Sequence, residues 1–297
     1  MGNRTETGVD HLIIGFTYLF LSILQLLIYL PCIVVMKRDQ DFQNNCFKLL
    51  RHQAIADMVN IVQQLALGVI VIAQLSIPWW FNKYFFGTTT AFAWQSYVAL
   101  CHTIALNRCV VVCWPQYEDT VFSDRATKKW IAACWLHAVL YWLLCMSPWL
   151  SNVYHGATFN IYFDMTAPLA PIVHLVTWWE SAILILLSGF WYLVIVLYLR
   201  LERREMPEES VQAASSVEQQ ERQIMKQAAA ICVYAIVLNQ YWCVTSYLPP
   251  FPYCYAVGNV LWTVNSGVNP VVFITMNKYV GAVGFLFLCS PGELGLS

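Results

Sequence analysis

Hydrophobic and polar positions follow one another in long blocks along this chain. Seven mostly apolar runs are separated by shorter polar stretches. About 20 apolar residues suffice to carry a helix across the hydrocarbon core of a bilayer. The strict alternation typical of a membrane β-barrel is absent. The pattern therefore predicts an all-α membrane protein, a seven-transmembrane helix bundle with spans at 12–36, 52–75, 89–113, 129–150, 172–199, 226–248 and 253–275.

Composition agrees with this class of protein. The chain is 59% hydrophobic and 11% charged, whereas soluble domains carry about 25% charged residues. The first apolar run is too long for the core of a cleavable signal peptide, so we expect it to remain as a span. A net charge of −1 without any basic cluster argues against a nucleic-acid partner. We interpret residues 1–297 as a single seven-transmembrane domain without an enzyme motif such as HExxH.

The basic residues predict an orientation. All but two of the 16 lysines and arginines fall on one side of the predicted spans, and Arg4 and Lys83 are the exceptions. The positive-inside rule then places the N-terminus outside and the C-terminus in the cytoplasm. The long polar stretch 200–226 becomes a cytoplasmic loop. Asn3 begins the sequon Asn3-Arg4-Thr5 in the segment predicted to lie outside, where it would be glycosylated.

An acidic residue lies inside the second predicted span. Asp57 is followed by Asn60 and Gln64, and this spacing places all three on one helix face. The face must point into the bundle, where a carboxylate needs a cation, a proton or several donors. A simple seam of hydrogen bonds between helices is an alternative reading.

The seventh predicted span contains the stretch VNSGVNPVVF. Pro270 has no N–H and clashes with the carbonyl of Ser266, which must then be satisfied by neighbouring groups. Asn265 and Asn269 lie near the same face. Arg108 ends the third span, where a long side chain can also simply reach the interface.

These three features together resemble the rhodopsin-like G-protein-coupled receptors. AIADMVN is similar to that family's second-helix motif, LNRC to its third-helix arginine motif, and NSGVNPVVF to its seventh-helix motif. MNKY resembles the start of a short amphipathic eighth helix. YLPCIVVMK and NNCFKLL are similar to patterns of the nematode serpentine chemoreceptors of class T, with class X as the alternative.

The resemblance implies a plasma-membrane chemosensory receptor. Such a receptor binds a small ligand in the outer half of its bundle and activates a heterotrimeric G protein, without a cofactor. Arg108 would take part in G-protein coupling, and Asp57 is a candidate sodium site. The polar core and activation residues that the resemblance implies are Asp57, Asn265, Ser266, Asn269, Pro270 and Trp242.

The sequence also departs from the family pattern. Asn107 and Cys109 replace the acid and the tyrosine beside Arg108, and Phe273 replaces the seventh-helix tyrosine. Val244 stands where the sixth-helix motif has proline. Residues 75–100 and 151–171 contain no cysteine, so the family's outer disulfide has no candidate. The outer loops must therefore be ordered in another way, or be mobile.

Absent residues narrow the ligand class. The span 253–275 has no lysine for a retinal Schiff base, and the third span has no acid near Thr90, where amine receptors carry one. His174, Trp178 and Glu180 remain as candidate ligand contacts, although Glu180 could instead pair with a neighbouring helix. A transporter or channel with Asp57 as its ion site is the alternative for the whole chain.

Overall fold

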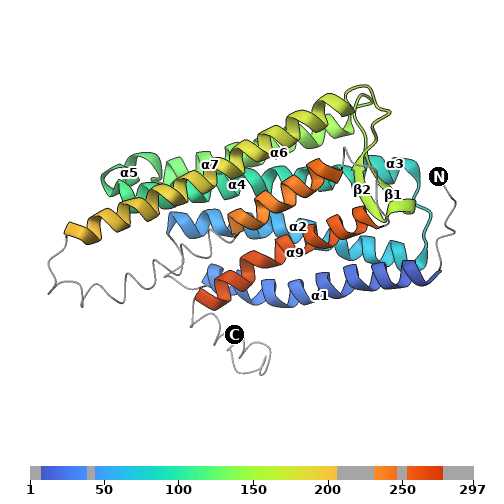
Figure 1. Cartoon of the computed structure of the whole chain (residues 1–297), viewed down its shortest axis with the longest axis horizontal. Coiled ribbons are helices and arrows are strands. Elements are labelled where there is room, and N and C mark those ends of the chain that lie inside the picture. Colours follow the sequence, from blue (N-terminus) through green and yellow to red (C-terminus); the bar gives the residue numbers. More distant parts are fainter. Residues whose placement is uncertain (1–7, 39–43, 206–230, 246–252, 277–297) are drawn as a thin grey trace.

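Long helices run side by side in one bundle, and a two-stranded sheet covers one end (Figure 1). The computed structural model describes residues 8–38, 44–205, 231–245 and 253–276. The long helices are α1 (Gly8–Arg38), α2 (Asn45–Ala73), α4 (Thr88–Cys113), α6 (Asp124–Met146), α7 (Ala170–Glu205), the helix Ile231–Thr245 and α9 (Cys254–Met276). The short helical elements are α3 (Trp79–Phe81), the π-helical turn Asn82–Gly87, the 3-10 turns Pro115–Tyr117 and Gly156–Thr158, and α5 (Glu118–Val121).

Over the described residues, each of the seven apolar runs overlaps a helix. The physical reason is that lipid offers backbone groups no partner, so each spanning segment must satisfy its own hydrogen bonds. Among the described helices, five are individually long and apolar enough to cross a membrane. The sixth run is described only over Ile231–Thr245. The expected eighth helix, the middle of the 200–226 loop and Asn3 lie outside the described residues.

Side-chain caps fix where α2 and α6 begin. The side chain of Asn44 accepts a hydrogen bond from the backbone N–H of Phe47 at 3.1 Å, and Ser123 accepts one from Ala126 at 3.3 Å. Such caps satisfy donors that the first helical turn leaves unpaired. α2 ends where Gln74 adopts the left-handed conformation, with φ of 49°. Local sequence thus determines the ends of these helices.

Glycines bring α1 and α2 into close contact. A Cβ atom on Gly68 would lie 2.9 Å from the backbone nitrogen of Leu19 and 3.0 Å from the carbonyl oxygen of Gly15. No side chain other than hydrogen fits between the two backbones at this point. Small residues play this role in membrane helix pairs generally, because close approach maximises van der Waals contact.

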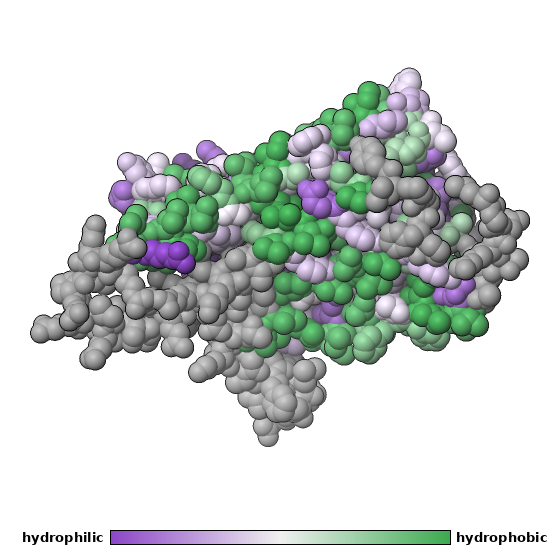
Figure 2. Space-filling model, in the orientation of Figure 1, coloured by the Kyte–Doolittle hydropathy of each residue, from purple (hydrophilic) through white to green (hydrophobic). Residues whose placement is uncertain are grey.

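The outside of the bundle is strongly apolar. Figure 2 shows hydrophobic residues across most of the visible face of the described helices. Large side chains that face outward include Phe16, Phe20, Leu140 and Leu186, each at least half exposed. In water such a surface would aggregate. Against lipid tails it is the expected surface of a spanning bundle.

A β-hairpin covers the end of the bundle where α1 begins (Figure 1). Strands β1 (Asn152–His155) and β2 (Asn160–Phe163) pair antiparallel, with Asn152 opposite Phe163 and His155 opposite Asn160. Neither strand was expected from the sequence, since each has only four residues. The hairpin answers the question of how a loop without a disulfide is ordered.

Hydrogen bonds attach the hairpin to the helices. The amide of Asn82 exchanges two bonds with the backbone of Tyr154, at 2.7 and 3.0 Å. Asn152 donates to the carbonyl of Gly87 at 2.9 Å, and a Cβ at Gly87 would lie 1.7 Å from the oxygen of Asn152. The hydroxyl of Tyr18 donates to the carbonyl of Phe159 at 3.1 Å. Noncovalent contacts from α1 and the π-helical turn Asn82–Gly87 therefore hold the loop.

Candidate signalling core and ligand cavity

Asp57 is the centre of a polar cluster between the helices. Its side chain is 2% exposed. Its Oδ2 accepts a hydrogen bond from the hydroxyl of Tyr29 on α1, and one from Nδ2 of Asn269 on α9 at 2.7 Å. An isolated buried carboxylate is costly, and two donors offset part of that cost. The seventh-span asparagine therefore reaches the second-span acid.

Two further contacts extend this cluster. Asn60 donates to the hydroxyl of Ser266 at 2.6 Å, and Tyr97 donates to the side-chain oxygen of Asn265 at 3.3 Å. The Oδ1 atom of Asn60 is buried and has no hydrogen-bond partner among the described residues. The cluster therefore joins α1, α2, α4 and α9 through polar side chains.

Gln64, the third residue of the polar face of α2, forms a separate pair. It exchanges two hydrogen bonds with Asn259 of α9, at 2.9 and 3.1 Å. Asp57, Asn60 and Gln64 are all at most 3% exposed, as their spacing predicted. The polar face of α2 thus binds α9 at three levels.

Pro270 and Trp242 occupy different environments. α9 continues as an α-helix through Pro270, which is buried. Trp242 lies away from the polar cluster, in an aromatic group with Trp262 and Tyr255, whose ring centroids are each 6.5 Å from its own. Gly258 leaves room for the Trp242 side chain, because a Cβ atom at this position would lie 2.9 Å from the Trp242 ring. Trp242 therefore lines the cavity that lies beneath the hairpin.

A cavity of about 210 Å³ lies beneath the hairpin. Residues of α2, α4, α6, α7, the helix Ile231–Thr245 and α9 form its walls, and hairpin residues cover it. Its lining combines apolar and aromatic side chains with amide, hydroxyl and imidazole groups, and small-molecule sites use such polar groups to orient a ligand. Thr90, at the position where an amine receptor would carry an acid, also lines it.

Two of the three candidate ligand contacts lie at the cavity, and the third lies elsewhere. His174 and Trp178 line the cavity, but Glu180 does not. Glu180 accepts hydrogen bonds from the hydroxyl of Tyr141 at 2.5 Å and from Gln95 at 3.4 Å, and its other oxygen lies 3.0 Å from Nε2 of His137. The alternative stated for Glu180, pairing with neighbouring helices, is therefore what its side chain does.

An aromatic path connects the cavity to the polar cluster. Trp94 lines the cavity, and its ring stacks on Tyr97 with centroids 5.8 Å apart. Tyr97 in turn donates to Asn265. A ligand that displaces Trp94 would therefore disturb the seventh-span motif through a single intervening residue. The sequence could not show this link, since tyrosine and tryptophan are ordinary residues in an apolar span.

Arg108 lies at the end of α4 remote from the hairpin. Its side chain is partly exposed, while its neighbours Asn107 and Cys109 are 1% and 0% exposed. Cys109 packs against Ile195 of α7. Among the described residues, no carboxylate forms an ion pair with Arg108. Buried, uncharged side chains therefore stand on both sides of the arginine, where the family pattern has an acid and a tyrosine.

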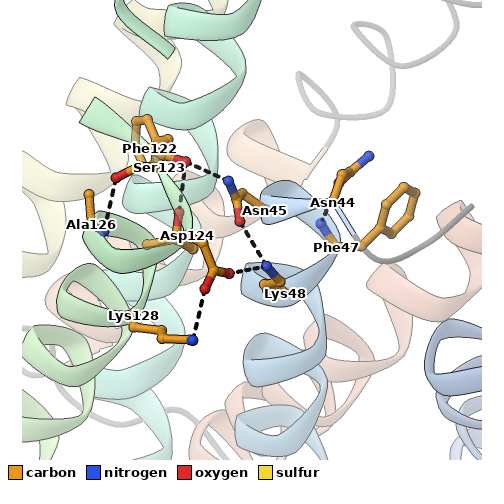
Figure 3. A network of polar contacts seen from close by, with 10 residues as sticks. Asn44, Asn45, Phe47, Lys48, Phe122, Ser123, Asp124, Ala126 and Lys128 are labelled. Atoms are coloured by element: carbon orange, nitrogen blue, oxygen red, sulfur yellow. Dashed lines mark hydrogen bonds and ion pairs between the residues drawn. The ribbon is translucent and has the colours of Figure 1, made fainter. Parts of the chain in front are cut away.

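A second polar network lies at this same end and was not anticipated (Figure 3). Lys48 of α2 contacts Asp124 at the start of α6, and Lys128 lies 2.8 Å from the other oxygen of Asp124. Asn45 donates to the carbonyl of Phe122 at 2.5 Å. Phe122 itself is fully buried. The network fixes the segment between α4 and α6 against the start of α2.

The comparisons with known proteins agree with this geometry. The fold is that of a seven-helix membrane receptor: the crystal structure of squid rhodopsin superposes with a TM-score of 0.78, covering 96% of this chain and 82% of that one at 14% identity. That identity supports a shared fold only. Among curated proteins, no sequence matches.

A family model settles the relationship at the level of sequence. The model of the serpentine type 7TM GPCR chemoreceptor Srt matches residues 2–290. The chain therefore belongs to the Srt family of serpentine seven-transmembrane G-protein-coupled chemoreceptors. The class T resemblance of its motifs is confirmed. Family membership makes the chain a multi-pass membrane receptor, and it decides against the transporter, channel and enzyme alternatives.

Proposed function

We propose that this receptor binds a small molecule in the cavity beneath the hairpin and activates a heterotrimeric G protein at the opposite end. The observation that carries this proposal is the contact path from Trp94 through Tyr97 to Asn265. It joins the cavity to the polar cluster around Asp57. A ligand can shift a two-state bundle only if it contacts the two states differently, and this path supplies such a contact.

We infer that the hairpin end faces outward at the plasma membrane. The distribution of basic residues supports this orientation through the positive-inside rule. In it, the cavity lies in the outer half of the bundle, and Arg108 and the Asp124 network face the cytoplasm. Asn3 would then be accessible for glycosylation.

The proposed mechanism centres on Asp57. Its donors come from α1 and α9, so a change in helix packing must break or replace these hydrogen bonds. The unpartnered Oδ1 of Asn60, the Asp57 carboxylate and the Ser266 hydroxyl are oxygen donors suited to a sodium ion. A bound ion would supply charge compensation in one of the two packings. Pro270 weakens backbone bonding in α9 and favours bending there.

Arg108→Ala tests the coupling half of the proposal. In reconstituted membranes with purified heterotrimers, we expect receptor-stimulated nucleotide exchange to fall by roughly 5- to 150-fold, the range of ordinary coupling energies. Lys129→Ala removes a cation from an exposed site near the start of α6 and should leave exchange unchanged. Full exchange by the Arg108 variant, at matched receptor density, would refute the role assigned to this residue.

A further inference from the structure

The lining of the cavity is uncharged. Among the described residues that line it, none is an aspartate, glutamate, lysine or arginine. Burying a charged ligand without a counter-charge costs far more than hydrogen bonds return. The lining therefore disfavours charged ligands. These include the amines and carboxylates that a pocket with a counter-charge would hold.

Several polar atoms in the lining are nevertheless available to a ligand. The side-chain amides of Asn160 and Asn239 and the indole N–H of Trp178 are buried donors without a partner among the described residues. Oε1 of Gln95 and Oδ1 of Asn152 are buried acceptors that also lack a partner among the described residues. Buried polar groups are normally hydrogen-bonded, so these atoms indicate a neutral partner that both donates and accepts.

Hairpin residues line the outward side of the cavity. Ile161, Tyr162 and Phe163 of β2 lie over it. Hydrogen bonds attach the hairpin to Asn82, Gly87 and Tyr18. Entry from water past the hairpin would disturb these contacts.

The seam between α6 and α7 is a loosely packed part of the cavity wall. Both helices pack along α4, but over the described residues they hardly contact each other. Hydrogen-bonded side chains close the seam instead: Tyr141 and Gln95 line the cavity and donate to Glu180. Glu180 lies on the far side of these groups, in a groove of α7 formed with exposed residues such as Trp179 and Ile183. One layer of polar side chains thus separates the cavity from the lipid-facing surface.

We propose that the cavity takes an uncharged, lipid-soluble small molecule with a hydrogen-bonding group, and that this molecule enters from the bilayer between α6 and α7. His137, Tyr141 and Glu180 form the gate. This proposal rests on the proposed ligand-binding function and specifies its ligand class and entry route. The volume is adequate, since a dry cavity of about 150 Å³ already binds benzene.

The ligand class is tested with a matched pair of probes. The purified full-length receptor in lipid nanodiscs is titrated with 1-naphthol, which is neutral, and with 1-naphthalenesulfonate, which carries the same ring and a charge. We expect saturable naphthol binding and at least about tenfold weaker sulfonate binding, because the sulfonate must lose its hydration. Ala91→Trp, which fills the cavity, should abolish naphthol binding.

Asn239→Leu provides a second variant that removes one unpartnered amide and keeps a similar volume. Naphthol affinity should fall by about 2- to 10-fold, the effect of one hydrogen bond. Three outcomes would overturn the ligand class: sulfonate binding as tight as naphthol binding, undiminished naphthol binding by both variants, or no saturable naphthol binding up to its solubility limit.

The entry route is tested by rates rather than affinities. His137 contacts Glu180 but does not line the cavity. His137→Ala should therefore raise both association and dissociation rates of naphthol by about 2- to 10-fold and leave Kd unchanged. Asn82→Ala, which loosens the hairpin instead, should change neither rate.

The opposite pattern, faster binding in Asn82→Ala and unchanged rates in His137→Ala, would overturn the lateral route in favour of entry from water. Unchanged rates in both variants would also overturn it. All these measurements are made without G protein. Failure of this proposal is therefore distinguishable from failure of the coupling tested with Arg108→Ala.

Discussion

At the scale of single residues, burial of the Asp57 carboxylate carries a large desolvation penalty. Asp57 has donors from two other helices, and each donor offsets part of the cost of burial. The energetic value of each donor is therefore greater than that of a hydrogen bond between neutral groups.

Tyr29→Phe isolates one of these donors. Removing the hydroxyl leaves Asp57 with fewer partners, and we expect a loss of about 1–3 kcal/mol in the stability of the folded bundle. Thermal unfolding in nanodiscs measures this loss. Tyr234→Phe is the matched control, since its hydroxyl donates at 2.6 Å to the neutral carbonyl of Leu261. A Tyr29 variant no less stable than the control would show that the hydroxyl contributes little to holding the carboxylate.

The sequence allowed part of this site to be predicted. Asp57 and Asn269 stand out because polar residues are rare and costly in spans, so their pairing could be anticipated. Tyr29 and Tyr97 could not be chosen, because apolar spans contain many aromatics that serve only packing or the interface. Their roles depend on where the hydroxyl points, and the tertiary structure alone determines that.

At the scale of elements, helices and hairpin differ in what determines them. Each helix follows from a long apolar run and its caps, which are local properties. The hairpin depends on Asn82, Gly87 and Tyr18, which are distant in sequence from its strands. No alternation of residue types over 152–163 could therefore have predicted it.

Gly68→Ala tests the contact between α1 and α2. The added Cβ would lie 2.9 Å from the backbone of Leu19, so the helices must separate, at a cost of about 1–3 kcal/mol. Gly189→Ala on α7 is the control, because nothing lies within 4 Å of its Cβ. Higher helix propensity should leave the control as stable as the parent or slightly more stable. Equal melting temperatures for the two variants would contradict the close approach.

Acidification should loosen the hairpin through His155. Burial lowers the pKa of this imidazole below its usual value, although the nearby Asp164 carboxylate partly offsets the effect. The stability contributed by the neutral ring is present above the ordinary histidine pKa and is lost as pH falls through the lowered value. Amide hydrogen exchange of 152–163, corrected for intrinsic rates, should therefore accelerate in acid.

His155→Phe keeps a ring to stack on Tyr162, whose centroid lies 4.1 Å away. This variant should lose the acid-induced acceleration while retaining protection at neutral pH. If acid accelerates exchange equally in both proteins, another group is responsible for the effect.

At the scale of the whole molecule, function requires that the cavity and the Arg108 end respond to each other. Trp94, Tyr97 and Asn265 supply a path from the cavity as far as the polar cluster. Tyr97 does not line the cavity, so Tyr97→Phe should leave naphthol affinity unchanged in receptor alone. Because coupling is reciprocal, G protein that tightens naphthol binding in the parent should do so less in the variant.

The expected change is in the ratio of naphthol Kd values without and with nucleotide-free G protein. Ordinary coupling gives a ratio of roughly 5 to 150, and Tyr97→Phe should bring it toward one. Tyr234→Phe, whose hydroxyl bonds outside this path, should keep the parent ratio. A Tyr97 variant with an unchanged ratio would mean that coupling runs through helix movement elsewhere, with the aromatic path serving only to pack the bundle.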